Sequence, residues 1–257
     1  MEVLVLTPDK IAKKAVEVEK TKANLSILKM LVLGILAGMF IALAGVGATI
    51  GSAHGGKLAG ALIFPIGLIM VVIAGSELFT GNNLMVMSWL KGKIKLRELL
   101  KNWLIVFIGN LLGALLVAFF VVYSGIFDSI SESVIATATT KSNLDFLEAI
   151  LRGVFCNFLV CIAVWMAFSA ETIAGKILAI FGPIFLFVLC GFEHSIAHMF
   201  YGPAGIFMGL RTGLAPENLN VGLFLINNLL PVTLGNIIGG AGLVSCFYYL
   251  VYLTNKK

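Results

Sequence analysis

Charged residues are scarce in this chain, and their scarcity excludes most soluble proteins. Asp, Glu, Lys and Arg make up 12% of its 257 residues, whereas 60% are hydrophobic. An ordinary water-soluble domain has roughly 25% charged residues. With a mean hydropathy of +1.04, the sequence predicts an integral membrane protein.

Cysteine is also sparse, and its spacing excludes a redox or zinc motif. The four cysteines contain no C-x-x-C pair and all lie in apolar segments, so we interpret them as small packing residues. They are Cys156, Cys161, Cys190 and Cys246. No disulfide, metal or other cofactor is therefore predicted.

Six apolar stretches are long enough to cross a bilayer, which takes roughly 20 residues per helix. They cover residues 27–52, 57–90, 99–125, 146–170, 173–211 and 221–253. The second and fifth are too long for one simple helix. We expect the charged, amphipathic residues 8–22 to lie on the membrane surface or at one mouth of the protein, and not to be a signal peptide.

Positive charge is distributed unevenly over the two ends of these spans. Of the 18 Lys and Arg residues, only four fall on one side, namely Lys57, Lys141, Arg152 and Arg211. The other side includes the tail residues Lys256 and Lys257. The positive-inside rule then predicts that both termini are cytoplasmic, in a multi-pass protein of the inner (plasma) membrane. Topology accounts for the basic composition, so no nucleic-acid partner is predicted.

A small polar insert interrupts the two longest stretches at corresponding places. The inserts are Gly75-Ser76-Glu77 and Gly191-Phe192-Glu193. A carboxylate inside an apolar run costs several kcal/mol unless it is paired or faces water. We interpret Glu77 and Glu193 as structural carboxylates, which accept hydrogen bonds from backbone N–H groups where helices two and five are broken. Proton carriers are the alternative.

The duplication extends to the third and sixth spans, where G-N-L-L-G-A at 109–114 resembles G-N-I-I-G-G-A at 235–241. Each copy has three spans, an odd number, so the second enters the membrane inverted. We expect one channel domain, 1–257, with a cytoplasmic N-terminal segment at 1–26, repeat one at 27–125 and repeat two at 146–253. An all-α inverted repeat with broken helices indicates a pathway at the middle of the membrane.

The two copies differ at a histidine. His194 corresponds to Leu78 in the first copy, and because histidine titrates near neutral pH, His194 is a candidate proton donor or a structural group. His194 and His198 stand at i and i+4, but no third metal-ligand cluster is visible. Lys141, before the fourth span, is either a solvated loop residue or a cation that attracts anions into a vestibule.

Four segments resemble the formate/nitrite transporter family. They are E-L-F-T-G-N at 77–82, C-N-F-L-V-C-I-A-V-W-M-A at 156–167, G-F-E-H-S-I-A at 191–197 and P-V-T-L-G-N-I-I-G-G at 231–240. Together with the six spans, the resemblance covers nearly the whole chain. It implies an aquaporin-like protomer with its own pore, assembled as a homopentamer in the lipid bilayer. Members of the family carry small monovalent anions such as formate, nitrite or hydrosulfide.

The resemblance also implies roles for individual residues. The pore and proton-transfer residues would be His194, hydrogen-bonded to Thr80, with Asn157 nearby and Lys141 in a vestibule. The constriction and moving loop would be formed by Phe64, Leu68, Leu78, Phe79 and Phe187. The chain departs from the family at His198, where an asparagine is usual.

A mechanism follows from these assignments. A bare anion that crosses two apolar rings meets a large desolvation cost, whereas the neutral acid crosses far more easily. We hypothesise that Lys141 and the half-helix dipoles draw the anion into a vestibule. Proton transfer that involves His194 or its connected water then neutralises it. The predicted partners are therefore protons and a small monovalent anion or its neutral acid.

Two other interpretations compete with this one. An aquaporin-like channel for small neutral solutes shares the six spans and the inverted repeat, but it normally has Asn-Pro-Ala at both half-helix starts, and the chain has no Asn-Pro pair. An intramembrane enzyme would use Glu193, His194 and His198, yet neither G-x-S-x-G nor H-E-x-x-H occurs. We therefore predict a channel and not an enzyme.

Overall fold

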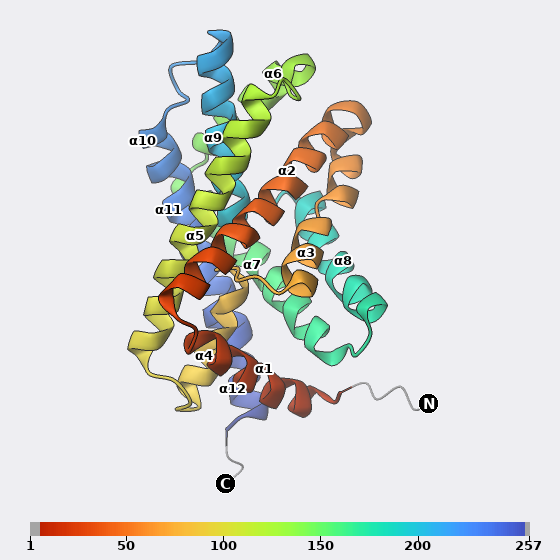
Figure 1. Cartoon of the computed structure of the whole chain (residues 1–257), viewed down its shortest axis with the longest axis vertical. Coiled ribbons are helices and arrows are strands. Elements are labelled where there is room, and N and C mark those ends of the chain that lie inside the picture. Colours follow the sequence, from red (N-terminus) through yellow and green to blue (C-terminus); the bar gives the residue numbers. More distant parts are fainter. Residues whose placement is uncertain (1–5, 255–257) are drawn as a thin grey trace.

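The computed structural model describes residues 6–254, and over that range the chain is helical with no strand, which confirms the predicted all-α class. The long helices run side by side along the molecule, and the first and last helices lie at the same end (Figure 1). Lys256 and Lys257, assigned above to the basic tail, lie outside the described residues.

The first repeat begins with a helical run that turns back on itself. Within the described residues, five segments are long and apolar enough to span a membrane, and one of them, Ile27–Ala74, has 48 residues. It contains α2 (Ile27–Ile63) and α3 (Ile66–Ala74). At Gly56 φ is +73°, a conformation that glycine adopts without steric cost. Beyond Gly56 the chain runs back along the first part of α2. The two parts are in close contact, since a Cβ at Gly60 would lie 2.8 Å from the Ala48 carbonyl oxygen. One run therefore holds the first predicted span and part of the second.

The remaining elements follow the predicted order of two copies. The first copy ends with η1 (Gly81–Leu84), α4 (Met85–Leu90) and α5 (Leu96–Tyr123). The second consists of α7 (Phe146–Ser169), α8 (Ile173–Cys190), α9 (Ser195–Thr212), α10 (Val221–Leu223), η3 (Phe224–Leu229), α11 (Leu230–Ile237), η4 (Ile238–Ser245) and α12 (Cys246–Tyr252). Segments η3 and η4 are π-helical. They have six and eight residues and lie within one continuous span, Val221–Tyr252.

Two polar segments form helices outside the spans. Residues 8–22, expected on the membrane surface or at one mouth, form α1 (Pro8–Ala23), which buries one apolar side against α4, α7 and α12. The segment between the repeats, expected as a polar connection, contains η2 (Asp128–Ile130) and α6 (Ser131–Ser142). Helix α6 packs on α9 and so closes one side of the molecule.

Glycines bring the outer helices of each repeat into close contact. A Cβ at Gly38 of α2 would lie 2.1 Å from the Asn110 carbonyl oxygen of α5. In the second copy, a Cβ at Gly239 would lie 2.0 Å from the Val154 carbonyl oxygen of α7. Only glycine permits such an approach. The contact sets an asparagine of each copy, Asn110 and Asn236, beside the helix breaks.

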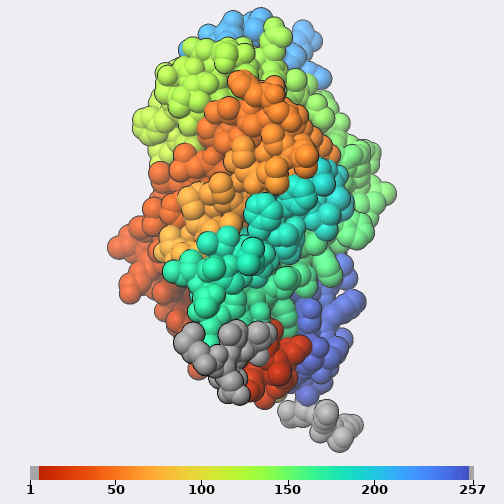
Figure 2. Space-filling view, turned by 90° about the vertical axis from the view of Figure 1, so that its right-hand side faces the viewer, coloured from red at the N-terminus to blue at the C-terminus, as the bar shows by residue number. Residues whose placement is uncertain are grey.

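The two helices that end at the breaks are neighbours. Helices α3 and α8 contact each other, and Figure 2 shows the orange α2–α3 segment against teal α8 on one face. The chain leaves each of them in the interior of the molecule, so both breaks lead into the same region.

Candidate functional site

A left-handed glycine ends each broken helix. Gly75 ends α3 with φ +79°, and Gly191 ends α8 with φ +76°. A side chain at either position would meet the steric cost that L-residues carry in this region. The next residues are not helical, and η1 and α9 begin a few residues later. The predicted breaks thus lie at the Gly-x-Glu inserts.

Asn110 holds the backbone of the first break. Its Oδ1 accepts a hydrogen bond from the Phe79 N–H at 3.0 Å. Its Nδ2 donates to the carbonyl oxygens of Gly34 at 2.8 Å and Glu77 at 2.9 Å. The Phe79 N–H and the Glu77 carbonyl lie in the non-helical break and have no helical partner. Leaving them unpaired in the interior would be costly. The bond to Gly34 ties Asn110 to helix α2.

Asn236 does the same for the second break. Its Oδ1 accepts from the Ser195 N–H at 2.9 Å, and its Nδ2 donates to the Gly153 and Glu193 carbonyl oxygens, each at 2.9 Å. The two asparagines are the equivalent positions of the repeated Gly-Asn pattern. The sequence displays that repeat, but its part in holding the breaks was not predicted.

The two glutamates act differently from the expectation. Within residues 6–254, neither carboxylate accepts a hydrogen bond from the backbone of its break. Glu77 accepts from the Asn82 side chain at 2.7 Å. Glu193 pairs with Lys141, Nζ to Oε2 2.6 Å, and with His198. The backbone role predicted for the carboxylates is thus wrong, because Asn110 and Asn236 already satisfy those groups.

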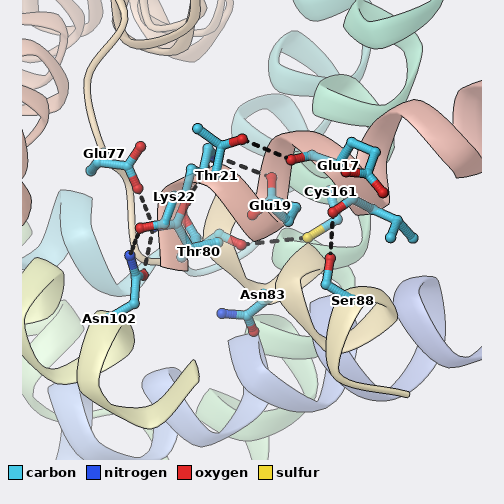
Figure 3. A network of polar contacts seen from close by, with 12 residues as sticks. Glu17, Glu19, Thr21, Lys22, Glu77, Thr80, Asn83, Ser88, Asn102 and Cys161 are labelled. Carbon is cyan, nitrogen blue, oxygen red and sulfur yellow. Dashed lines mark hydrogen bonds and ion pairs between the residues drawn. The ribbon is translucent and has the colours of Figure 1, made fainter. Parts of the chain in front are cut away.

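The Glu77 carboxylate connects the first break to helix α1 through a polar network, called here the α1 network. Its members are Glu19, Lys22, Glu77, Asn82 and Asn102. The Lys22 ammonium donates to Asn82 Oδ1 at 2.9 Å, and Asn82 Nδ2 donates to both Glu77 and Asn102. Lys22, Glu77 and Asn102 converge in Figure 3. This α1 network places a cation of the N-terminal helix directly at the break.

Glu19 is the buried carboxylate of the α1 network. Its side chain has no exposed surface, and its Oε1 lies 3.1 Å from the Lys22 Nζ (Figure 3). Burial raises the pKa of Glu19 to about 7; the Lys22 charge opposes this shift, and the nearby Glu77 adds to it. Ionisation of Glu19 near neutral pH therefore changes the charge beside the first break.

A hydrogen bond joins the two breaks to each other. Thr80 Oγ1 and His194 Nε2 lie 2.9 Å apart, and both side chains are buried. His194 Nδ1 accepts from the Ala197 N–H at 3.2 Å and so caps α9. A nitrogen that accepts carries no proton, so neutral His194 is protonated at Nε2 and donates to Thr80.

Three cavities follow one another through this region, because each neighbouring pair shares lining residues. The α6-side vestibule has about 270 Å³. The α1-side vestibule has about 300 Å³. Between them lies a chamber of about 10 Å³, close to the space that one water molecule needs. The α6-side vestibule is lined by, among others, Lys57, Lys141, His194, His198 and Tyr201, and the α1-side vestibule by Lys14, Lys22, Glu77 and Lys176.

Apolar side chains separate the chamber from both vestibules. The rings of Phe64 and Phe187 meet edge to face with centroids 5.7 Å apart, and both line the chamber and the α6-side vestibule. Leu68 and Leu78 line the chamber and the α1-side vestibule. His194 is the polar side chain of the chamber. A permeant must therefore shed most of its water between two vestibules that contain cations.

Phe79, assigned above to the constriction, lies elsewhere. It lines none of the three cavities. Its ring packs edge to face on Phe107 and Trp103 of α5, with centroids 5.0 and 5.8 Å away. Because Asn110 holds the Phe79 N–H, the side chain is directed to α5. In this structure the Phe79 ring thus lies beside α5 and not beside the chamber.

Asn157 also has protein partners away from the chamber. Its Nδ2 donates to the Asn236 carbonyl oxygen at 2.7 Å and to Asn83 Oδ1 at 3.3 Å. It lines none of the three cavities. In this structure Asn157 supports the helix that carries the Asn236 brace.

The acidic and histidine side chains form ion pairs. In the described part of the chain, no group of three or more His, Cys, Asp or Glu side chains is placed to hold a metal ion. Glu193 is surrounded by Lys141 and His198, with Arg152 Nη1 3.8 Å away. Cations around a carboxylate favour binding of an anion over binding of a metal.

Comparison with known proteins adds to this geometry. A sequence model of the family described as formate/nitrite transporter matches residues 9–250. The chain is 40% identical over 270 residues to the formate channel FocA of Escherichia coli (strain K12), covering 96% of this chain and 95% of that protein. It is 39% identical to a probable formate transporter of Methanothermobacter thermautotrophicus, covering 96% and 97%.

The fold is similar to solved channel structures. One is described as a pentameric formate channel with formate bound; it is 38% identical, with a TM-score of 0.81, covering 89% of this chain and 98% of that chain. Another, an FNT family ion channel, is 29% identical, with a TM-score of 0.83, covering 96% and 98%.

Proposed function

Because the chain belongs to the formate/nitrite transporter family and is an anion channel of that family, we propose that it passes formate through a pore in each protomer. Nitrite and hydrosulfide are the other candidate substrates, since both are small monovalent weak-acid anions. Relatives described as formate channels support formate. The proposed role is transport and not catalysis.

The single observation that carries the proposal is the order of the cavities. Two vestibules of about 270 and 300 Å³ flank a chamber of about 10 Å³. Formate and nitrite have only three non-hydrogen atoms each and hydrosulfide only one, and each must lose its water to pass such a chamber. The apolar rings on both sides make that loss costly for a charged species.

Neutralisation of the anion lowers this cost. The Lys141 ammonium draws the anion into the α6-side vestibule. A proton from the vestibule, relayed through water connected to His194, converts the anion into its neutral acid, and the relaying water regains its own proton from the vestibule. The acid then crosses the chamber, where His194 is the hydrogen-bonding side chain and Thr80 holds it at Nε2. Passage is thus linked to a proton that accompanies each anion.

The proposed assembly is a homopentamer in the inner (plasma) membrane with both termini in the cytoplasm. A similar solved structure is described as pentameric, and the helices α1 and α12 lie at one end of the molecule (Figure 1). The α1-side vestibule, which has Lys14, Lys22 and Lys176 in its lining, would then open to the cytoplasm. This agrees with the positive-inside rule.

Proteoliposomes test the proposal. Purified protein is reconstituted, and uptake of formate, nitrite and hydrosulfide is measured with a pH-sensitive dye while current is recorded. We expect formate uptake that rises as the external pH falls. His194→Asn should reduce uptake and flatten its pH dependence. His54→Asn is the matched control, because His54 is exposed and lines none of the three cavities.

Two outcomes would contradict the proposal. One is that proteoliposomes with the wild-type protein take up none of the three anions, but change volume with glycerol in stopped-flow light scattering, as vesicles with an aquaporin-like channel would. The other is His194→Asn protein with unchanged uptake and unchanged pH dependence, which would remove His194 from the mechanism.

A further inference from the structure

A second histidine faces the α6-side vestibule next to Lys141. His198 is buried, one turn into α9, and lines the same cavity as His194. The vestibule cluster, defined here as Lys141, Glu193 and His198, brings a cation, an anion and an imidazole to one point. The transport proposal above gives no role to His198.

One nitrogen of His198 is fixed by its partner. Nδ1 lies 2.6 Å from Asn228 Oδ1. Asn228 uses its Nδ2 to donate to the Lys141 carbonyl oxygen at 2.8 Å, so its Oδ1 is the acceptor that faces the imidazole. His198 Nδ1 therefore carries a proton and donates. Any change of charge on His198 must occur at Nε2.

His198 Nε2 has a partner for each protonation state. When Nε2 is bare, it accepts from the Lys141 ammonium, whose Nζ lies 3.2 Å away. When Nε2 is protonated, it donates to the Glu193 carboxylate, with which it is in contact. Neither state requires a side chain to move to a new site. The cluster can thus take up one proton and change its net charge from zero to +1.

The other groups around His198 are fixed in charge or neutral. Arg152 approaches the far oxygen of Glu193, with Nη1 3.8 Å from Oε1, and also pairs with Glu148. The Tyr201 ring lies under the Lys141 Nζ at 5.6 Å. The titratable, charged and polar groups that pack on the cluster or line the same vestibule are Lys57, Lys141, Glu148, Arg152, Cys156, Glu193, His194, Tyr201 and Asn228.

His194 lacks the same choice. Its Nδ1 accepts from the Ala197 N–H, and its Nε2–H donates to Thr80. A second proton on Nδ1 would face a backbone N–H at the start of α9, where the helix dipole already disfavours positive charge. We infer that His198, and not His194, is the vestibule histidine that binds a proton, and that its protonation adds a positive charge which concentrates small anions before the constriction.

This inference rests on the proposed function and gives the vestibule a sensitivity to pH. Histidine ordinarily changes charge between about pH 5 and 8. As the pH falls through that window, the cluster gains a charge beside the apolar rings. Anion concentration in the vestibule then rises at the same pH at which the neutral acid becomes more abundant. The two effects act in the same direction.

The chain has only three histidines, so their protonation can be followed directly. The whole channel is labelled with 15N-histidine, and spectra are recorded from pH 5 to 8 without any anion substrate. His54→Asn and His198→Asn proteins assign the signals. We expect the His198 signal to change to the doubly protonated form as the pH falls, and His194 to stay protonated at Nε2 alone throughout. A His198 signal that stays neutral to pH 5, or a His194 signal that titrates in its place, would overturn the inference.

Uptake supplies the functional arm. The variant His198→Asn keeps an N–H group that can donate to Asn228 Oδ1, but it lacks the Nε2 position that binds the proton. If this variant does not assemble, His198→Gln replaces it in the same uptake measurement. We expect wild-type and variant uptake to be equal at pH 8 and the wild type to be about fivefold faster at pH 5.5, because the added positive charge raises the local concentration of anions in the vestibule. His54→Asn should match the wild type at both pH values.

The two arms separate the failures. If the wild type takes up none of the three anions, the proposed function fails, while the spectra still decide which histidine binds the proton. If the wild type transports but the ratio of wild-type to His198→Asn uptake is constant from pH 8 to 5.5, His198 does not set the vestibule charge and the inference is wrong.

Discussion

Thr80 Oγ1 lies 2.9 Å from His194 Nε2, although the two residues are 114 positions apart. The bond connects the first helix break to the second, beside the chamber that His194 lines. It is asymmetric, because the position equivalent to His194 in the first copy is Leu78. The repeat thus builds two equal breaks, and one side chain from each makes the contact between them.

The first prediction concerns this bond. Thr80→Val keeps the shape of the side chain but leaves the buried His194 Nε2–H without its partner, which typically costs about 1–3 kcal/mol. Thr80→Ser keeps the hydroxyl. We expect thermal unfolding in detergent to occur at a clearly lower temperature for Thr80→Val than for Thr80→Ser. Thr254→Val, at an exposed position, is the control. Equal unfolding temperatures for the two Thr80 variants would show that the bond contributes nothing.

The second prediction concerns the asparagine braces. Asn110→Ala would leave two buried backbone groups of the first break unpaired, the Phe79 N–H and the Glu77 carbonyl, and Asn236→Ala would do the same to the Ser195 N–H and the Glu193 carbonyl at the second. We expect each to lower stability by at least about 2 kcal/mol, as measured by thermal unfolding and by yield of the assembled protein. Asp at either position keeps the acceptor but directs an oxygen at the carbonyl oxygens, so it should destabilise at least as much as Ala.

A control and a contrary result complete that test. Asn24→Ala removes an exposed side chain that bonds only the Lys20 carbonyl oxygen, and it should be near neutral. If Asn110→Ala and Asn236→Ala were no more destabilising than Asn24→Ala, other groups would have to hold the breaks.

The sequence predicts the helical class, both breaks and the duplication, because these leave patterns in apolar length, glycine and repeated motifs. It does not predict the braces. Asn110 and Asn236 lie 31 and 41 residues from the N–H groups that they bind, so only the packed glycines of the neighbouring helices bring them together. Helix α6 is missed for a similar reason, since it buries only three apolar side chains, Val134, Ile135 and Ala138, in a polar segment.

Phe79 and its neighbour Leu78 show what the sequence does not predict about the backbone after the break. Leu78 and Phe79 are adjacent in the chain, and both were assigned to the constriction. Leu78 lines the chamber, whereas Phe79 packs on α5 because its backbone is held by Asn110. Which of two neighbouring side chains faces the pore depends on the backbone path after the break, and that path depends on a residue from another helix.

The third prediction follows from this difference. Phe187→Ala removes one of the two rings at the α6-side constriction and should raise uptake of acetate relative to formate several-fold, because the wider opening accepts the extra methyl group. Phe79→Ala should leave the acetate-to-formate ratio unchanged, although loss of the buried ring costs about 3–5 kcal/mol. Uptake of both anions into proteoliposomes gives the ratio. A changed ratio in Phe79→Ala would place Phe79 at the pore after all.

The fourth prediction concerns pH and the N-terminal helix. The pKa of Glu19 is raised from 4.5 to about 7 by burial in the docked α1 helix, so the docked helix binds a proton more tightly than the free helix. Docking is thus favoured in full below about pH 4.5, and this contribution is lost as the pH rises through 7. We expect the backbone amides of α1, corrected for intrinsic exchange rates, to be better protected from hydrogen exchange at pH 5 than at pH 8.

Glu19→Gln should remove this dependence, because a glutamine at that position is neutral at both pH values and keeps nearly the same shape. Glu17→Gln is the matched control: it lies on the same helix, and its carboxylate is 61% exposed, so the wild-type dependence should persist. If α1 in the wild type were equally protected at pH 5 and pH 8, the Glu19 carboxylate would not govern docking. If the dependence survived in Glu19→Gln, another group of the α1 network, with Lys22 and Glu77 the nearest, would have to carry it, because these two side chains lie beside Glu19 at the first break.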